Sequence, residues 1–290
     1  MIDNFILFLK KIKISLIFFF KHQLIHQKKK KKFKKDIKIF IDKLNRNENF
    51  AFVRFSDGEL FILENKKLII SKNYWSLNNK KIFNSFDKND QKEFIPSKHQ
   101  FYRNQLIESI IFKKKNYFKG ISCSCCNGKK NVNFMKNFCN NDKNLTFSNL
   151  LQNNNYPEFV ETIVKIFKKK NIILVANKNH DQLKLPFRVK KKFNIGKNCL
   201  INDFNIIEKI KNFIKNNKIE DHLFLISASS LSNILIMKLF KNFDKNTYLD
   251  VGSTLNAYYS KNILSKSRSY LSEYWLNDQS TKHLKKICYW

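Results

Sequence analysis

Residues 52–60 read Phe-Val-Arg-Phe-Ser-Asp-Gly-Glu-Leu, and this stretch decides the expected fold. The apolar run Phe50–Phe55 is typical of a buried strand. Asp57–Glu64 begins like a helix, because acidic residues in a first turn suit the helix dipole. A buried strand that enters a helix through a polar turn indicates the first unit of an α/β domain.

The same alternation continues along the chain. Residues 145–151 show no clear pattern, but helices are expected over 36–47, 101–112, 157–170, 204–214 and 231–240, and strands over 68–70, 117–124, 171–176, 199–201, 223–226 and 248–249. Apolar strands that alternate with helices predict a Rossmann-like α/β fold. In that fold a mostly parallel sheet carries helices on both faces.

Polar loops follow the apolar strands. They are Ser56–Glu59, Asn177–Asp181, Ser227–Ser230 and Asp250–Ser253. In parallel α/β sheets, ligands bind outside the carboxyl ends of the strands. If these strands are parallel, all four loops gather at one edge of the sheet and form the ligand site.

Two carboxylates flank a glycine in the first loop. Asp57 and Glu59, on either side of Gly58, are predicted to share one hard cation such as Mg²⁺ or Mn²⁺. Such a cation neutralises a diphosphate leaving group. Arg54 lies just before the turn, where a guanidinium can clamp a phosphate. The alternative is an ordinary acidic helix start with a capping role.

The two later loops offer different chemistry. Ser227, Ser229 and Ser230 precede a helix, where small residues expose backbone N–H groups to an anion or simply cap the helix. Asp250 is expected to accept a hydrogen bond from a hydroxyl, to orient a metal-bound water or to act as a base; the alternative is a helix cap. Gly252 is one of only 5 glycines, which suggests a position that a side chain cannot fill.

Composition argues against several function classes. The net charge is +33 over 290 residues, but lysine supplies nearly all the cations, whereas proteins that read bases rely on arginine. Nucleic-acid binding is therefore not expected. The 6 cysteines form no disulfide framework and no zinc spacing, which predicts a cytoplasmic protein. No Walker, dinucleotide-binding or nucleophile-elbow motif occurs.

The N-terminal region is apolar and then strongly basic. Phe5–Leu9 and Leu16–Phe20 are shorter than the ~20 apolar residues of a spanning helix, and Lys28–Lys32 follows them. This order fits a helix on the anionic cytoplasmic face of a membrane; the alternative is a helix that packs on the domain. We expect a membrane-surface segment over residues 1–35, one domain over 36–275 and a tail over 276–290.

One motif carries a family resemblance. Phe52–Leu60 resembles the RFGDGE signature of the GT-D-type glycosyltransferases and their GT-D-like relatives, with Ser56 in place of the first glycine. A Ser-Ala-Gly-Pro type loop of that family corresponds to Ser227–Ser230. Further segments with the expected order are 147–159, 173–177, 248–255 and 267–270, so that the resemblance spans about residues 37–275.

The resemblance implies a single Rossmann-like domain that transfers a sugar from a nucleotide-diphosphate donor, a UDP-sugar above all. It implies that Asp57 and Glu59 bind the donor diphosphate and Mn²⁺ or Mg²⁺. The acceptor would be a glycan or lipid-linked molecule in surface polysaccharide biosynthesis. Asn149, Asn177 and Asp250 would shape the donor pocket or assist proton removal. The alternative function is a non-catalytic, membrane-associated scaffold of the same fold.

Overall fold

A seven-stranded parallel sheet forms the centre of the molecule. The computed structural model describes residues 27–71, 74–77, 80–83, 91–140, 142–259, 271, 274 and 275. The strand order is β7-β6-β1-β11-β10-β8-β9, and every pair of neighbours is parallel. The strands are β1 (Ala51–Phe55), β6 (Tyr117–Ile121), β7 (Leu145–Phe147), β8 (Ile172–Asn177), β9 (Val189–Ile195), β10 (Leu223–Ile226) and β11 (Thr247–Asp250).

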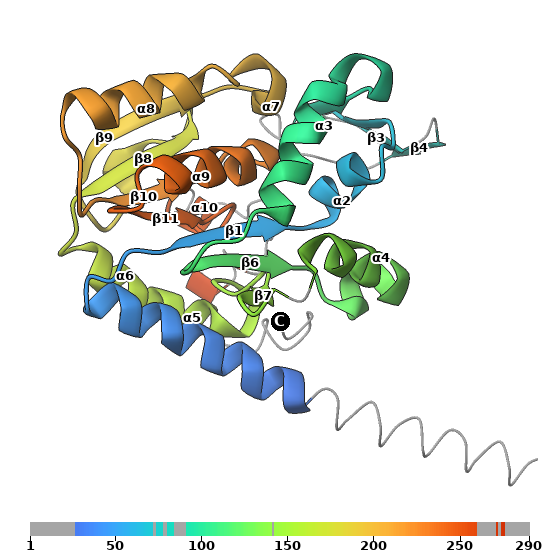
Figure 1. Cartoon of the computed structure of the whole chain (residues 1–290). Helices are drawn as coiled ribbons and strands as arrows, with labels where there is room; N and C mark the ends of the chain where they lie inside the picture. Colours follow the sequence, from blue (N-terminus) through green and yellow to red (C-terminus); the bar gives the residue numbers. More distant parts are fainter. Residues whose placement is uncertain are drawn as a thin grey trace, which may run out of the picture.

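Helices cover both faces of this sheet, as Figure 1 shows. Above it in that view lie α3 (Pro96–Ile111), α8 (Ile206–Asn216) and α9 (Ser230–Asn242), and below it lie the helix over residues 27–45, α5 (Tyr156–Glu158) and α6 (Val164–Phe167). The remaining helices are α2 (Asp57–Leu63), α4 (Ser124–Cys139), α7 (Cys199–Asn202) and α10 (Asn256–Tyr259), with a π-helical turn over Phe159–Ile163 and 3₁₀ turns over Asn153–Asn155 and Gln182–Lys184. The expected α/β architecture is confirmed.

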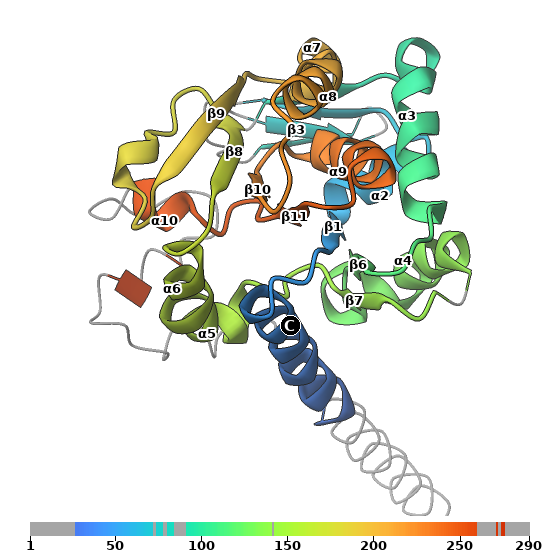
Figure 2. The same ribbon diagram turned by 60° about the vertical axis from the view of Figure 1, so that its left-hand side comes forward.

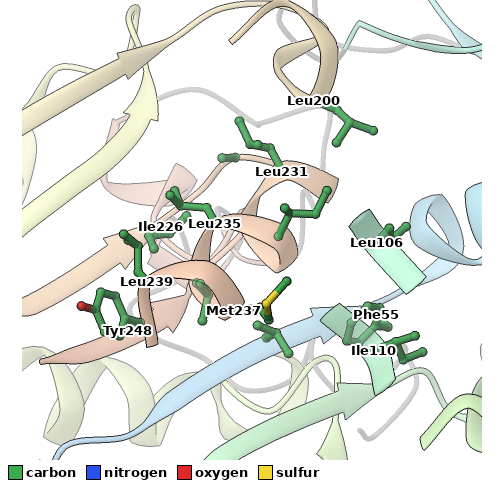
Figure 3. Close-up of a cluster of buried hydrophobic side chains, with 14 of the residues drawn as sticks. Phe55, Leu106, Ile110, Leu200, Ile226, Leu231, Leu235, Met237, Leu239 and Tyr248 are labelled. Carbon is green, nitrogen blue, oxygen red and sulfur yellow. The ribbon is translucent and has the colours of Figure 1, made fainter. Parts of the chain in front are cut away.

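The strands alternate between two hydrophobic cores. Val53 and Phe55 of β1 point to the α9 side, whereas Phe52 packs in the cluster below the sheet. Figure 3 shows the upper core, in which Leu235 of α9 lies beside Ile226 and Met237 of α9 lies between the helix and β1; Phe55 lies beside Ile110 of α3. Strands buried on both faces read as continuous apolar runs, which is why they could be recognised from the sequence.

The helix over residues 27–45 packs along the lower face of the domain. Phe33, Ile37, Phe40 and Leu44 are at most 3% exposed. Asn155 donates a hydrogen bond to the carbonyl of Phe33 at 3.2 Å, so the helix and α5 lie side by side, as Figures 1 and 2 show. The helix continues across the domain boundary expected at residue 35. The apolar runs before residue 27 lie outside the described residues, as does the tail over 276–290.

A second, smaller sheet interrupts the alternating pattern. It has the antiparallel order β4-β3-β2-β5, with β2 (Leu68–Ile70), β3 (Tyr74–Leu77), β4 (Lys80–Phe83) and β5 (Lys92–Phe94). In Figure 1 it lies to the right, beyond α2. The strand expected over 68–70 is correct, but it pairs here and not in the large sheet.

One expected strand is wrong. Cys199–Ile201 is part of the short helix α7, and the neighbouring strand is β9, which the sequence did not reveal. β9 is the edge strand, with three consecutive lysines (Lys190–Lys192) and only Ile195 buried, so it lacks the apolar run of the inner strands.

The described part of the chain contains no helix that is both long enough and apolar enough to span a membrane.

Candidate functional site

The parallel sheet brings the four predicted loops to one edge. β1, β8, β10 and β11 run in the same direction, so the loops that follow them leave the sheet on the same side. β1, β11 and β10 are immediate neighbours. The loops after these three strands therefore form the centre of the candidate site.

Arg54 lies at the middle of this centre. Its side chain is 9% exposed, and one guanidinium nitrogen donates to the carbonyl of Val251 at 3.4 Å. The carbonyl of Arg54 accepts from the side-chain amide of Asn233 at 2.8 Å, which fixes β1 against α9. The guanidinium also lies directly over Gly252, where an added Cβ would be 2.6 Å from a guanidinium nitrogen. Gly252 has a φ of +46°, so both space and backbone conformation favour glycine.

Glu59 is held from several directions. Its Oε2 accepts from the backbone N–H of Ser56 at 3.0 Å, which completes a capping box at the start of α2. Its Oε1 accepts from the hydroxyl of Ser230 at 2.6 Å and lies 3.8 Å from the ammonium of Lys92. Ser56 and Glu59 thus cap α2, which was the alternative to a metal site in the sequence analysis. Glu59 also links α2 to the start of α9.

Asp57 and Glu59 do not form a chelate. Both lie in the first turn of α2, where residues two positions apart point in opposite directions. Accordingly, Asp57 is exposed and Glu59 is 7% exposed. The described residues contain no group of three His, Cys, Asp or Glu side chains placed to hold a metal ion. The two carboxylates therefore do not fit the shared cation that their spacing predicted, because that prediction placed them in an open turn and not in a helix.

The loop Ser227–Ser230 contacts both neighbouring loops. The hydroxyl of Ser227 donates to the carbonyl of Gly252 at 2.7 Å, and Ser230 reaches Glu59. Ser229 has φ +49° and ψ −142°, a conformation that favours glycine. The loop thus keeps a glycine-like backbone at the position where the resembling family has glycine. Ser229 and Ser230 open the 13-residue helix α9; the N–H groups of Leu231 and Ser232 already donate to the carbonyls of Ala228 and Ser229, so the N–H groups of Ser229 and Ser230 are the ones that suit an anion.

Asp250 is buried behind Arg54. Burial raises its pKa from 3.8 to about 7, and the charge of Glu59 raises it too; Arg54 and the N–H groups of Gly252 and Arg54 oppose the shift. Its Oδ1 accepts from the N–H of Gly252 at 2.9 Å. Because Asp250 is only 5% exposed, it is better placed to orient Arg54 and the Gly252 turn than to meet an acceptor hydroxyl.

The burial of Asp250 predicts a pH-dependent stability. A carboxyl with a raised pKa contributes stability below the unfolded value, and this contribution is lost as pH rises through the folded value. At ~1.4 kcal/mol per pKa unit, the shift from 3.8 to about 7 corresponds to about 4 kcal/mol. We expect the unfolding free energy of the wild type, relative to Asp250→Asn, to fall by an amount of this order between pH 4 and 7 in urea titrations.

Asp244→Asn is the control for this titration. The hydrogen bond from Lys114 lowers the pKa of Asp244 below 3.8, so its contribution to stability is lost only at more acidic pH and its difference curve should be nearly flat between pH 4 and 7. Parallel pH curves for wild type and Asp250→Asn would contradict the burial argument.

Asn149 and Asn177 lie farther out than expected. Asn149 follows β7, two strands from β1, and Asn177 ends β8, three strands from β1 on the other side. At ~4.8 Å per strand they lie about 10 and about 14 Å from β1. The side chain of Asn177 also accepts from the N–H of Asn179 at 3.0 Å, which is a turn-forming role. Neither residue belongs to the centre.

Three further residues belong to the candidate site, although the sequence analysis did not identify them. Lys92 comes from β5, Asn233 from α9, and Gln152 from the segment after β7, where its amide donates to Thr254 at 2.8 Å. All three have polar side chains that are largely or fully buried. A buried polar residue among many similar surface residues leaves no pattern in the sequence.

An open hollow lies at the same edge of the sheet, over the ends of β8 and β9, which are three and four strands from β1. It measures about 450 Å³ and is lined by residues 178–182 with Lys192 and Asn194. The ring of His180 stacks on Tyr259 at 4.3 Å between centroids, next to this hollow.

The fold is similar to solved structures. One is described as a new glycosyltransferase (domain of unknown function 1792) from Streptococcus sanguinis; it is 12% identical, with a TM-score of 0.51, over 79% of this chain and 84% of that chain. Another is described as the domain of unknown function 1792 with a distinct glycosyltransferase fold, at 12% identity and TM-score 0.48, over 75% and 78%. No family model and no curated protein matches the chain. The similarity to the Streptococcus sanguinis structure shows that this chain shares its fold.

Proposed function

We propose that the chain is a glycosyltransferase that takes its sugar from a nucleotide-diphosphate donor, with a UDP-sugar as the first candidate. The observation that carries the proposal is the meeting of Arg54, the Ser227–Ser230 loop and the Asp250–Gly252 turn at the carboxyl edge of a parallel sheet. Anionic ligands of α/β sheets bind at this edge. The shared fold is consistent with the same function.

The residues divide the work as follows. Arg54 binds a donor phosphate through charge-assisted hydrogen bonds, and the N–H groups of Ser229 and Ser230 at the start of α9 donate to another phosphate oxygen. Asp250 and Gly252 orient the guanidinium. The sugar and its acceptor then occupy the hollow beside residues 178–182. We propose a glycan or lipid-linked acceptor, as expected for surface polysaccharide biosynthesis.

Substitution of Gly252 tests the role of Arg54 without removing its charge. In Gly252→Ala the new Cβ would overlap the guanidinium, which must move, and the positive φ costs about 1–2 kcal/mol. We expect UDP binding, measured by calorimetry, to fall at least about tenfold, because one charge-assisted hydrogen bond is lost.

Gly128→Ala is the matched control. Gly128 also has a positive φ, of +75°, but an added Cβ there has no neighbour within 4 Å. It should lose stability and keep its UDP affinity. Equal UDP affinities in the two variants would show that the contact between Gly252 and Arg54 does not shape the site.

A donor panel tests the proposed activity. The full chain is incubated with UDP-, GDP- and ADP-sugars, with and without Mn²⁺, and the release of nucleoside diphosphate is measured. Release from at least one donor is the expected result. Binding without release would favour the non-catalytic scaffold, and salt-sensitive DNA retention without nucleotide binding would revive nucleic-acid binding.

We also propose that the chain lies on an anionic membrane surface. The described part of the first helix buries Phe33 and Ile37 while Lys28, Lys31 and Lys35 are exposed on its outer side. An exposed basic face of this kind is attracted to anionic lipid headgroups. The full chain should sediment with phosphatidylserine vesicles and be released by salt; retention on neutral vesicles alone would contradict this.

A further inference from the structure

A lysine occupies the place where the donor site was expected to hold a metal ion. Lys92 belongs to β5 of the small sheet, and its ammonium lies 3.8 Å from Oε1 of Glu59 and 3.0 Å from the hydroxyl of Ser230. It also covers Gly58, where an added Cβ would lie 2.9 Å from the ammonium nitrogen. Gly58 therefore provides the space that Lys92 fills.

We infer that Lys92 is the built-in cation of the donor site and that the chain binds nucleoside diphosphates without a divalent metal ion. This inference rests on the proposed function. It identifies Lys92 as the cation that neutralises the second negative charge of the diphosphate, beside Arg54. Arg54 and Lys92 together supply two positive charges at the carboxyl edge of the sheet, close to the start of α9.

The surroundings of Lys92 leave its ammonium group able to bind phosphate. Its side chain is 12% exposed, and within the described residues it makes one hydrogen bond, to Ser230. An ammonium has three N–H donors. At 3.8 Å the carboxylate of Glu59 balances the charge without taking up a donor at hydrogen-bond distance. The remaining N–H groups of Lys92 can donate hydrogen bonds to phosphate oxygens.

The position of Lys92 is fixed by the backbone around it. β5 pairs with β2, which places Lys92 opposite Ile70, and the residues on either side of Lys92 are bonded to Asn198. The N–H of Asn198 donates to Gln91 at 2.8 Å, and its side chain accepts from Glu93 at 3.0 Å. The small sheet thus serves the site by holding one cation against α2 and α9.

Lys92 and a metal ion would compete for Glu59. A Mg²⁺ ion bonds to a carboxylate oxygen at ~2.1 Å, so an ion on Oε1 would lie no more than about 6 Å from the ammonium nitrogen. Both oxygens of Glu59 already accept hydrogen bonds from Ser56 and Ser230. A buried divalent ion beside an ammonium is strongly disfavoured.

Calorimetric titration tests the inference. UDP and inorganic pyrophosphate are titrated into the full chain in EDTA and, separately, in Mn²⁺. The wild type should bind UDP equally well in both buffers. In EDTA, Lys92→Met should weaken UDP and pyrophosphate binding at least about tenfold, because charge-assisted hydrogen bonds are lost. Lys92→Arg keeps the charge and should retain most of the affinity.

Lys98→Met is the control, since Lys98 is exposed on α3 and its removal changes the net charge equally. Wild-type UDP binding that requires Mn²⁺ would overturn the inference and leave the proposed function standing. Unchanged affinity of a folded Lys92→Met in EDTA would overturn it as well. If Lys92→Met does not fold, the inference is tested by comparing the UDP affinities of the wild type and Lys92→Arg in EDTA and in Mn²⁺. No nucleotide binding in either buffer would overturn both the inference and the proposed function.

Discussion

Asp142→Ala is expected to lower the free energy of unfolding by about 3–5 kcal/mol, because it leaves a buried ammonium without its partner. Lys119 of β6 is 0% exposed, and its ammonium lies 2.8 Å from Oδ2 of Asp142, whose side chain is 7% exposed. The Oδ1 of Asp142 also accepts from the N–H of Asn144 at 2.9 Å. The pair anchors the segment before β7 to the sheet. Urea titration measures the effect.

Two further variants show whether burial is the cause. The double variant Asp142→Ala with Lys119→Met removes the unpaired charge and should recover most of the loss, since apolar replacements of buried ion pairs are often neutral. Asp244→Ala breaks a 2.9 Å pair with Lys114 whose side chains are 54% and 33% exposed, and it should cost about 1 kcal/mol or less. Equal losses for Asp142→Ala and Asp244→Ala would contradict the burial argument.

Arg54→Met is expected to weaken UDP binding by about 10- to 100-fold, the range that one hydrogen bond to a charged group provides. The guanidinium is held by Val251 and Gly252 and is the central cation of the site. Its removal should also raise the pKa of Asp250 further, since Arg54 lowers that pKa. Calorimetry measures the first effect, and the pH dependence of stability measures the second.

Arg103→Met serves as the matched control. Arg103 is a partly buried arginine whose guanidinium donates twice to the carbonyl of Leu63, at 3.2 and 2.9 Å. It should lose stability and retain UDP affinity. If Arg54→Met and Arg103→Met bind UDP alike, Arg54 does not contact the donor.

The large sheet could be predicted because its inner strands are buried on both faces. Leu223–Ile226 is uniformly apolar and was found with its observed bounds, and the strand before Ser56 differs by one residue. The edge strand β9 and the strands of the small sheet are short or rich in lysine. Their pairing depends on partners elsewhere in the chain, and local patterns do not contain that information.

The site could be predicted in its location but only partly in its chemistry. Parallel strands bring Arg54, Ser227 and Asp250 together, and the loops alone indicated this. The opposite exposure of Asp57 and Glu59 follows from the helix that contains them, and the Ser-x-x-Glu spacing of a capping box was the signal for it. Lys92 could not be found, because one lysine among 56 basic residues has no distinguishing pattern.

A crystal structure of the full chain with UDP bound tests the central claim most directly. We expect the diphosphate to contact the guanidinium of Arg54 and the N–H groups at the start of α9, at the carboxyl edge of the large sheet. The sugar would extend toward the hollow beside residues 178–182. A diphosphate bound away from Arg54 and the Ser227–Ser230 loop would contradict the proposed donor site.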